Sequence, residues 1–314
     1  MIVTVAAGPY AHLAALAAGN GAPGIDNGID RLDLQYEALE PGRIFPRMLR
    51  DAAWDVAEMS LATMYILAER GERSLVALPV FPSRAFRHSA LYVHTRSTVR
   101  SVDDLRGGRI GVLRYAMTTA VWVRAMLADQ YGIPAQTLQW TVGEDSSHPA
   151  RVAPRIVEGL PALERMAVAG ELDCLISGRT PAAFHNGRLR RLFPDFGAEE
   201  KEYYSRTRIF PIMHVMVAQR ALVERQPRIV SALVKRFEAA KRVAEEGLLN
   251  FDISTYPLPW LAAYVEDARR LVGGELWPYG IEANRATLAA FGSALATDGL
   301  TSRACAPEEI FADA

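Results

Sequence analysis

The sequence predicts an α/β protein of two lobes with a ligand cleft between them. Short apolar runs alternate with helical patterns through the first half of the chain, as in parallel sheets covered by helices. Two segments, residues 81–94 and 205–218, break this alternation and combine prolines and basic residues with an apolar strand. The 314 residues, 50% of them hydrophobic, suit two domains with separate cores.

The first lobe begins with strands predicted at residues 2–7, 54–59 and 74–80 and helices at 43–52 and 61–70. Ser60 stands where the second helix needs its N-cap, and Gly71 ends that helix. Strands joined through helices in this way run parallel, so their carboxyl ends share one edge of the sheet.

A second unit of the same kind follows. Its elements are a glycine-stopped turn at 101–108, strands at 109–113, 138–142 and 172–177, and helices at 117–131 and 160–169. The polar segment 143–159 predicts a surface loop or flap. The last third is helical, at about 221–248, 259–271 and 282–298.

The two irregular segments predict the domain boundaries. If the chain enters the second lobe near residue 90 and returns near 212, lobe 2 is an insertion of residues 90–211. Lobe 1 then consists of residues 1–89 and the mostly helical residues 212–314. A cleft between two such lobes is a natural ligand site.

Composition excludes several classes of protein. The net charge of −1 provides no general attraction to nucleic acid or to an anionic membrane, so an anion site needs a local arginine cluster.

No apolar run is long enough to span a membrane, and the chain enters its first strand without an export signal, so we expect a cytoplasmic protein. Cys174 and Cys305 are too few and too distant for a disulfide framework.

Several catalytic motifs are missing. The sequence has no glycine-rich dinucleotide or phosphate loop, no GxSxG nucleophile elbow, and no HExxH or Cys/His zinc spacing among its six histidines. These absences disfavour dehydrogenases, hydrolases and metalloproteases. We expect no metal site, and a metal held by residues distant in the sequence stays open.

The densest polar cluster lies in the first irregular segment, at residues 79–89. Arg84, Arg87 and His88 stand close together there, and arginine is suited to bidentate binding of carboxylates. The alternative is that one or two of these side chains are solvated or pair with nearby acids.

Other candidates stand at strand ends, where open α/β sheets bind ligands. In lobe 2, Arg114, Tyr115 and Thr118 open a helix whose N-terminus favours anions, and Ser177 follows the last strand. A plain capping role for the threonine is the alternative.

The equivalent positions of lobe 1 are occupied by Tyr10, His12, Glu58 and Ser60. In a dry site Glu58 would become a proton donor, and otherwise it is a surface acid or a partner for a hinge arginine.

The second irregular segment contributes Arg208 and His214. His214 lies between Met213 and Val215, so it is either a packed core histidine or an acid–base group at the hinge.

Six blocks of this sequence resemble the 4,5-dihydroxyphthalate decarboxylase family, whose members have a type II periplasmic-binding-protein-like fold. The blocks are residues 45–50, 54–60, 79–89, 111–118, 210–214 and 277–285. The sequence departs from the family at Tyr10-Ala11-His12, where relatives tend to have Tyr-Asp-basic, and the glycine-rich stretch 19–28 matches loosely. This departure leaves the substrate open.

The resemblance implies non-oxidative decarboxylation of a hydroxylated aromatic acid, such as 4,5-dihydroxyphthalate to protocatechuate. This reaction requires no organic cofactor. The partner expected is a small aromatic carboxylate, with a homo-oligomer left open. Arg84, Arg87 and Arg114 would hold the retained carboxylate. His88, His214 and Glu58 are the candidates for proton transfer, with His12 as a further one.

Two alternatives remain. One is a solute-binding protein for a small organic anion, which the same fold and arginines would suit. The missing export signal is the feature that separates it from an enzyme. The other is a related cytoplasmic enzyme of the same fold.

Overall fold

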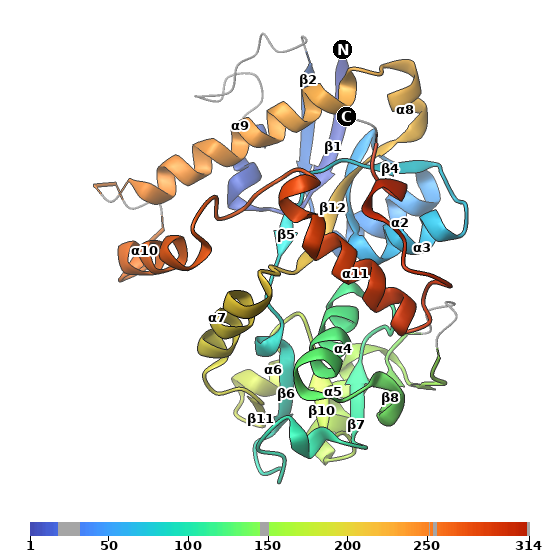
Figure 1. Cartoon of the computed structure of the whole chain (residues 1–314), viewed down its shortest axis with the longest axis vertical. Helices are drawn as coiled ribbons and strands as arrows, with labels where there is room; N and C mark the ends of the chain where they lie inside the picture. The colour runs from blue at the N-terminus through green and yellow to red at the C-terminus, as the bar shows by residue number, and fades with distance from the viewer. Residues whose placement is uncertain (18–31, 145–150, 251, 254–255, 313–314) are drawn as a thin grey trace. The chain divides into compact units, whose positions relative to one another are not determined.

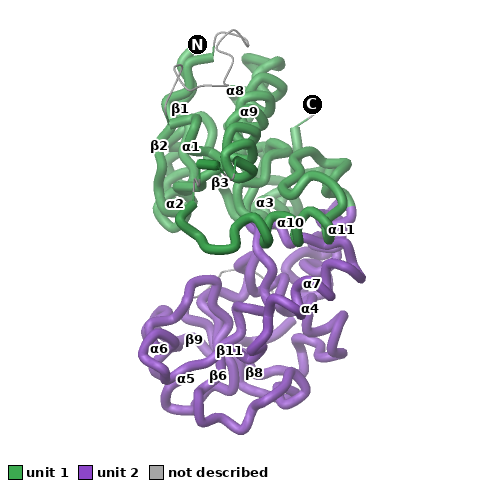
Figure 2. The backbone as a smooth tube through the Cα atoms, turned by 90° about the vertical axis from the view of Figure 1, so that its left-hand side faces the viewer, with its two compact units in different colours: residues 1–83, 214–285, 307–314 green, residues 84–213, 286–306 purple. Residues whose placement is uncertain are grey.

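The computed structural model describes residues 1–17, 32–144, 151–250, 252–253 and 256–312 (Figure 1). The chain forms two compact units, drawn in green and purple in Figure 2. Unit 1 contains residues 1–83, 214–285 and 307–314, and unit 2 contains residues 84–213 and 286–306. The glycine-rich stretch 19–28 and residues 145–150 of the expected flap lie outside the described residues.

Unit 1 is built on a mixed sheet with the strand order β2-β1-β3-β12-β4. Its strands are β1 (Ile2–Ala7), β2 (Asp33–Ala38), β3 (Val56–Ser60), β4 (Leu75–Ala77) and β12 (Ile212–Gln219), with β5 (Ser83–Arg84) paired to β12. The strands β1, β2 and β3 are parallel, whereas β12 is antiparallel to both β3 and β4. The first residues of β12 therefore lie beside the last residues of β3.

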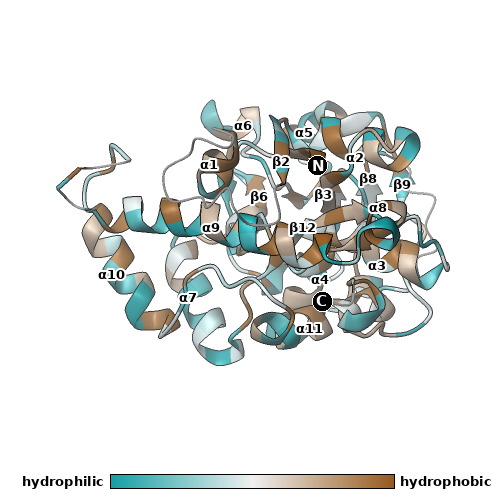
Figure 3. Ribbon diagram, turned by 90° about the horizontal axis from the view of Figure 1, so that it is seen from above, coloured by the Kyte–Doolittle hydropathy of each residue, from teal (hydrophilic) through white to brown (hydrophobic). Residues whose placement is uncertain are grey.

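Unit 1 also contains helices, most of which pack beside this sheet. They are α1 (Ala14–Ala17), α2 (Pro41–Asp51), α3 (Leu61–Glu69), α8 (Arg220–Arg225), α9 (Ile229–Leu249) and α10 (Leu261–Val272). In α9 a buried apolar stripe at helical spacing, Val230, Leu233, Phe237 and Ala240, faces the core, and Figure 3 shows apolar and polar colours alternating along it. Pro227 separates α8 from α9 because it has no N–H to continue the helix, so the single helix predicted at 221–248 is two.

Unit 2 has its own sheet, with the order β11-β6-β10-β7-β8-β9. The strands are β6 (Leu91–His94), β7 (Arg109–Val112), β8 (Gln139–Val142), β9 (Arg155–Ile156), β10 (Cys174–Ile176) and β11 (Leu189–Arg191). Four of them, β10, β7, β8 and β9, are parallel, and β6 runs antiparallel to β10. The helices are α4 (Thr118–Tyr131), α5 (Gly159–Ala169), α6 (Ala182–His185), α7 (Phe196–Thr207) and α11 (Arg285–Thr297).

The end of the chain differs from the predicted domain assignment. Residues 212–314 were all assigned to lobe 1, but residues 286–306 pack within unit 2. On α11, the Phe291 ring lies 5.0 Å from that of Trp122, and just beyond the helix the Asp298 carboxylate accepts a 2.7 Å hydrogen bond from Arg124 Nε. The Arg124 and Asp298 side chains are 1% and 4% exposed. Separating these two side chains would leave an unpaired charge in the interior, so the ion pair holds this segment against α4.

Several elements had no counterpart in the sequence prediction, among them β2 and α7. Alternating polar residues make β2 half exposed at the edge of its sheet, and α7 has a single buried residue, Tyr203. Helices and strands are predicted from the periodicity of their apolar residues, and these two elements have too few apolar residues to show it. No helix in the described ranges combines the length and apolar character needed to cross a membrane.

Candidate active site

The Glu58 carboxylate is the centre of a buried polar cluster in unit 1. Glu58 is fully buried on β3. Its Oε2 accepts a 2.6 Å hydrogen bond from the Gly8 N–H, and its Oε1 accepts one of 2.6 Å from the Tyr10 hydroxyl. The same Oε1 lies 2.5 Å from Nδ1 of His214. A carboxylate without access to water needs such donors, because burying it unpaired is costly.

The sheet topology brings these residues together. Gly8 and Tyr10 follow β1, and Glu58 lies near the end of the adjacent parallel strand β3. His214 pairs with Ser60 across the antiparallel β12, which makes its side chain a diagonal neighbour of Glu58 on the same face. The cluster therefore occupies the strand-end position where open α/β sheets bind ligands.

Gly8 is required for this packing. A Cβ atom at this position would lie 2.5 Å from the Tyr10 ring, a distance that side-chain atoms do not tolerate. The Tyr36 hydroxyl donates a 2.9 Å hydrogen bond to the Gly8 carbonyl, so β2 also holds this turn. Burial, together with the Glu58 charge, raises the pKa of both Tyr10 and Tyr36, and both phenols therefore act as neutral donors.

His214 is held by one ring nitrogen only. Because a carboxylate accepts but does not donate hydrogen bonds, Nδ1 carries the proton shared with Glu58. The Phe45 ring meets the imidazole edge-on at 5.1 Å, which fixes its orientation. The side chain is 21% exposed, and no residue in the described ranges forms a hydrogen bond with Nε2. Nε2 is thus the atom that can exchange a proton with a bound molecule.

His12 lies against the same cluster. Its ring stacks on Tyr10 at 5.4 Å between centroids and meets Trp277 at 5.2 Å. Burial lowers the pKa of His12 to about 4, so the imidazole is neutral at physiological pH.

In unit 2, Arg87 is the predicted arginine whose surroundings suit an anion. Its Nε donates to the Met213 sulfur at 3.0 Å, and none of the described carboxylates forms an ion pair with it. Burial lowers the pKa of Arg87 to about 10, which still leaves it charged at neutral pH. A Cβ atom at Gly178 would lie 3.6 Å from Arg87 Nη1 and 3.3 Å from Thr119 Oγ1, so both side chains border the end of β10.

The other predicted arginines have protein partners. Arg84 donates to the Phe210 carbonyl at 3.3 Å and lies over the Phe210 ring. Arg114 is half exposed and pairs with Glu144 at 3.6 Å. Arg208 ends α7 in a left-handed conformation, with its guanidinium over the Tyr204 ring. Substrate binding by these three stays a prediction.

His88 and Tyr115 are packed in the interior of unit 2. His88 is 1% exposed, its Nε2 lies 3.1 Å from Gln130 Oε1, and the rings of Phe193 and Tyr203 flank it. Tyr115 is 2% exposed, with the Arg124 guanidinium 3.8 Å from its ring centroid. Burial raises the pKa of Tyr115 to about 12. These surroundings are those of interior residues, and proton transfer by His88 and substrate binding by Tyr115 stay predictions.

The predicted hydroxyl side chains occupy strand and helix ends as expected. Thr118 is buried at the first position of α4 and Ser60 is the N-cap residue of α3. The Ser177 hydroxyl donates to the Arg179 carbonyl at 2.6 Å. Within the described ranges, no three His, Cys, Asp or Glu side chains come together in a way that could hold a metal ion.

Sequence reasoning missed Gly8, Tyr36 and Phe45 as parts of the site. Two of them could have been found from the sequence, because Phe45 stands in a block that resembles the decarboxylase family and Gly8 directly follows the first strand. Tyr36 lies on the unpredicted strand β2 and could not be found in this way.

The fold places the chain in a known structural class. No family model matches the sequence. The structure resembles the alkanesulfonate-binding protein of Xanthomonas axonopodis pv. citri, with a TM-score of 0.55 at 14% identity over 99% of this chain and 98% of that one. The chain thus has the periplasmic-binding-protein fold, a class whose members differ widely in what they do.

Sequence similarity narrows the class to a family. The chain is 34% identical to the 4,5-dihydroxyphthalate decarboxylase of Comamonas testosteroni over 321 residues, which cover 98% of this chain and 96% of the relative. It is 33% identical to the enzyme of the same name from Pseudomonas putida over 64% of this chain and 81% of the relative. The chain belongs to the 4,5-dihydroxyphthalate decarboxylase family and is therefore a carboxy-lyase.

Proposed function

We propose that the chain removes one carboxylate of 4,5-dihydroxyphthalate as CO2 to give protocatechuate, with His214 as the proton donor. The observation that carries this proposal is the imidazole held by Glu58 through Nδ1 with Nε2 left for a ligand. Both relatives are named for this reaction.

The reaction replaces a carboxylate with a hydrogen. In 4,5-dihydroxyphthalate each carboxylate is para to a hydroxyl group, which pushes electron density onto the ring carbon that carries it. A proton from Nε2 adds to that carbon, and the phenol stabilises the ring while aromaticity is lost. The bond to CO2 then breaks, its electron pair restores the ring, and CO2 leaves. The overall reaction consumes one proton for each CO2 released.

Glu58 serves this step by holding His214. Its carboxylate fixes the orientation of the ring and stabilises the imidazolium that must form before each proton transfer. Gly8 and Tyr10 in turn hold the carboxylate. A positioned general acid of this kind contributes about 10²- to 10⁴-fold to a rate.

We assign binding of a substrate carboxylate to Arg87. It is a partly buried guanidinium that forms no ion pair in the described part of the chain, although Glu200 lies near enough to act on its pKa. A planar guanidinium can form two parallel hydrogen bonds with a carboxylate. Thr119 Oγ1 borders the same position and supplies a further hydroxyl.

The test is incubation of the purified protein with 4,5-dihydroxyphthalate in D2O, with CO2 and product followed together. We expect one CO2 for each protocatechuate and one deuterium at the vacated ring carbon. Tight binding without turnover, across a panel of hydroxybenzoic and phthalic acids, would instead support a solute-binding protein and refute the proposal.

A further inference from the structure

A cavity of about 250 Å³ lies within unit 1 beside the Tyr10 cluster. Its walls come from the turn at Ala11–Leu13, from one face of α9 and from the segment that contains Trp277. Besides short apolar side chains, the rings of Tyr256 and Trp277 line it, and His12, Lys241 and Glu245 are its polar members. Flat rings facing apolar walls suit an aromatic ligand.

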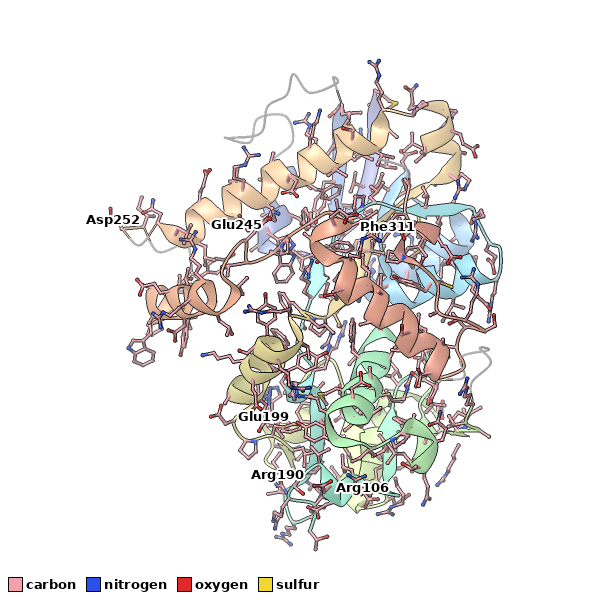
Figure 4. All side chains as sticks on the ribbon, in the orientation of Figure 1. Arg106, Arg190, Glu199, Glu245, Asp252 and Phe311 are labelled. Carbon is pink, nitrogen blue, oxygen red and sulfur yellow. The ribbon has the colours of Figure 1, made fainter. Side chains whose placement is uncertain are left out.

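Two buried acceptor atoms on the cavity wall lack partners. His12 Nε2 and Glu245 Oε1 are both inaccessible to solvent and form no hydrogen bond with any described residue. Figure 4 shows Glu245 on α9. The His12 ring bonds to the backbone of Pro82, which offers only a carbonyl, so the ring N–H points there and Nε2 is an acceptor. Because buried polar atoms are nearly always paired, these two indicate a ligand that donates hydrogen bonds.

The charges around the cavity disfavour a carboxylate. Lys241 is 2% exposed, and its ammonium group already donates to Glu275, Glu238 and the Trp277 carbonyl. Glu245 interacts electrostatically with four charged neighbours, namely Lys241, Arg269, Glu238 and Glu275. Counting Glu245 itself, three carboxylates face two cations. The cavity therefore suits neutral hydroxyl groups, and a ligand carboxylate needs another site.

We propose that this cavity binds the hydroxyl-bearing edge of the aromatic substrate, with His12 Nε2 and Glu245 Oε1 accepting the two phenolic O–H groups and Trp277 packing on the ring. The inference rests on the proposed function and adds the part of the site that selects the substrate. A phenol that donates to these acceptors gains electron density in its ring, which favours proton addition at the carbon para to it. His12 connects the two regions, since it stacks on Tyr10.

The experiment uses two ligands that cannot react, protocatechuate and benzoate, which differ only in the two hydroxyl groups. Their affinities for the full-length protein are measured by isothermal titration calorimetry. The variants are His12→Phe, which keeps the stacked ring, and Glu245→Gln, which keeps the shape. The matched control is Glu238→Gln, because Glu238 also pairs with Lys241 but does not line the cavity. Circular dichroism checks that each variant is folded.

We expect the wild type to bind protocatechuate more tightly than benzoate. Each cavity variant should weaken protocatechuate binding by about 10-fold and leave benzoate binding unchanged, because His12→Phe removes one acceptor and Glu245→Gln removes the charge of the other. Glu238→Gln should change neither. Equal losses for both ligands, or no preference for protocatechuate in the wild type, would overturn the inference.

The same data separate this inference from the proposed function. A hydroxyl preference that both cavity variants abolish, in a protein that does not decarboxylate 4,5-dihydroxyphthalate, would support the hydroxyl site and refute the reaction. Decarboxylation with unchanged affinities in His12→Phe and Glu245→Gln would support the reaction and refute the hydroxyl site.

Discussion

Replacement of Glu58 by glutamine tests how the buried carboxylate controls His214. Three donors converge on Glu58, namely the Gly8 N–H, the Tyr10 hydroxyl and His214 Nδ1. Glutamine keeps the shape but turns one acceptor oxygen into an NH2 group. The NH2 group then faces another donor unless the imidazole gives up its Nδ1–H tautomer, and the imidazolium loses the negative charge beside it.

The two consequences differ in size. A buried donor left without an acceptor lowers the free energy of unfolding by about 1–3 kcal/mol. The effect on the reaction is larger, because the ring no longer keeps the Nδ1–H tautomer that directs Nε2 to the substrate. In serine proteases the corresponding carboxylate-to-amide change lowers kcat by about 10⁴-fold, so we expect a loss of about 10³- to 10⁴-fold for Glu58→Gln.

The assay is steady-state CO2 release from 4,5-dihydroxyphthalate, combined with thermal denaturation. Asp55→Asn is the matched control. Asp55 accepts hydrogen bonds from the backbone N–H and the hydroxyl of Thr4, at 2.9 and 2.8 Å, so it joins β1 to β3 just as Glu58 does. It does not contact His214, and its variant should lose stability while kcat stays the same.

The reasoning fails if the two variants behave alike. Equal losses of kcat in Glu58→Gln and Asp55→Asn would show that Glu58 only joins the strands. A Glu58→Gln variant with normal kcat and reduced stability would show the same.

Three further predictions concern other parts of the site. Arg87→Met should raise KM for 4,5-dihydroxyphthalate by about 10- to 100-fold through loss of a charge-assisted pair, with Tm checked in parallel; an unchanged KM would remove Arg87 from the site. Gly8→Ala should lower both kcat and Tm, because its Cβ would press on the Tyr10 ring; kinetics and calorimetry equal to wild type would contradict the close packing. His12 has a folded pKa of about 4 against 6.5 unfolded, so the unfolded chain binds the extra proton between these values and stability falls as pH drops from 6.5 to 4. Urea unfolding of wild type and His12→Phe should therefore diverge by up to about 3 kcal/mol over that range, and parallel curves would refute the burial of a neutral ring.

The sequence predicted the parts of the fold that have strong apolar patterns. The strand at residues 2–7 and the buried helices fall where the pattern places them, because their side chains fill cores. The edge strand β2 was missed because only one of its faces is partly buried. The transfer of α11 to unit 2 depends on contacts with Trp122 and Arg124, about 170 residues away, which no local pattern records.

The candidate site could likewise be predicted only in part. Glu58 and His214 were predicted because a strand end and a chain crossing are places where ligands bind, and the antiparallel pairing of β12 then brought them together. His88 was grouped with Arg87 on spacing alone, yet its ring turns into a cage of aromatic side chains while Arg87 keeps a thioether as its neighbour. No sequence motif surrounds Glu245, whose Oε1 has no hydrogen-bond partner among the described residues, so this residue was found only from the geometry.

The role of His214 as the proton donor is tested most directly by His214→Asn. The asparagine amide takes the place of Nδ1 and can still donate to Glu58, but it has no counterpart of Nε2. We predict that kcat for 4,5-dihydroxyphthalate falls by about 10²- to 10⁴-fold, with KM and Tm close to those of the wild type. A His214→Asn variant that turns over this substrate at the wild-type rate would contradict the account.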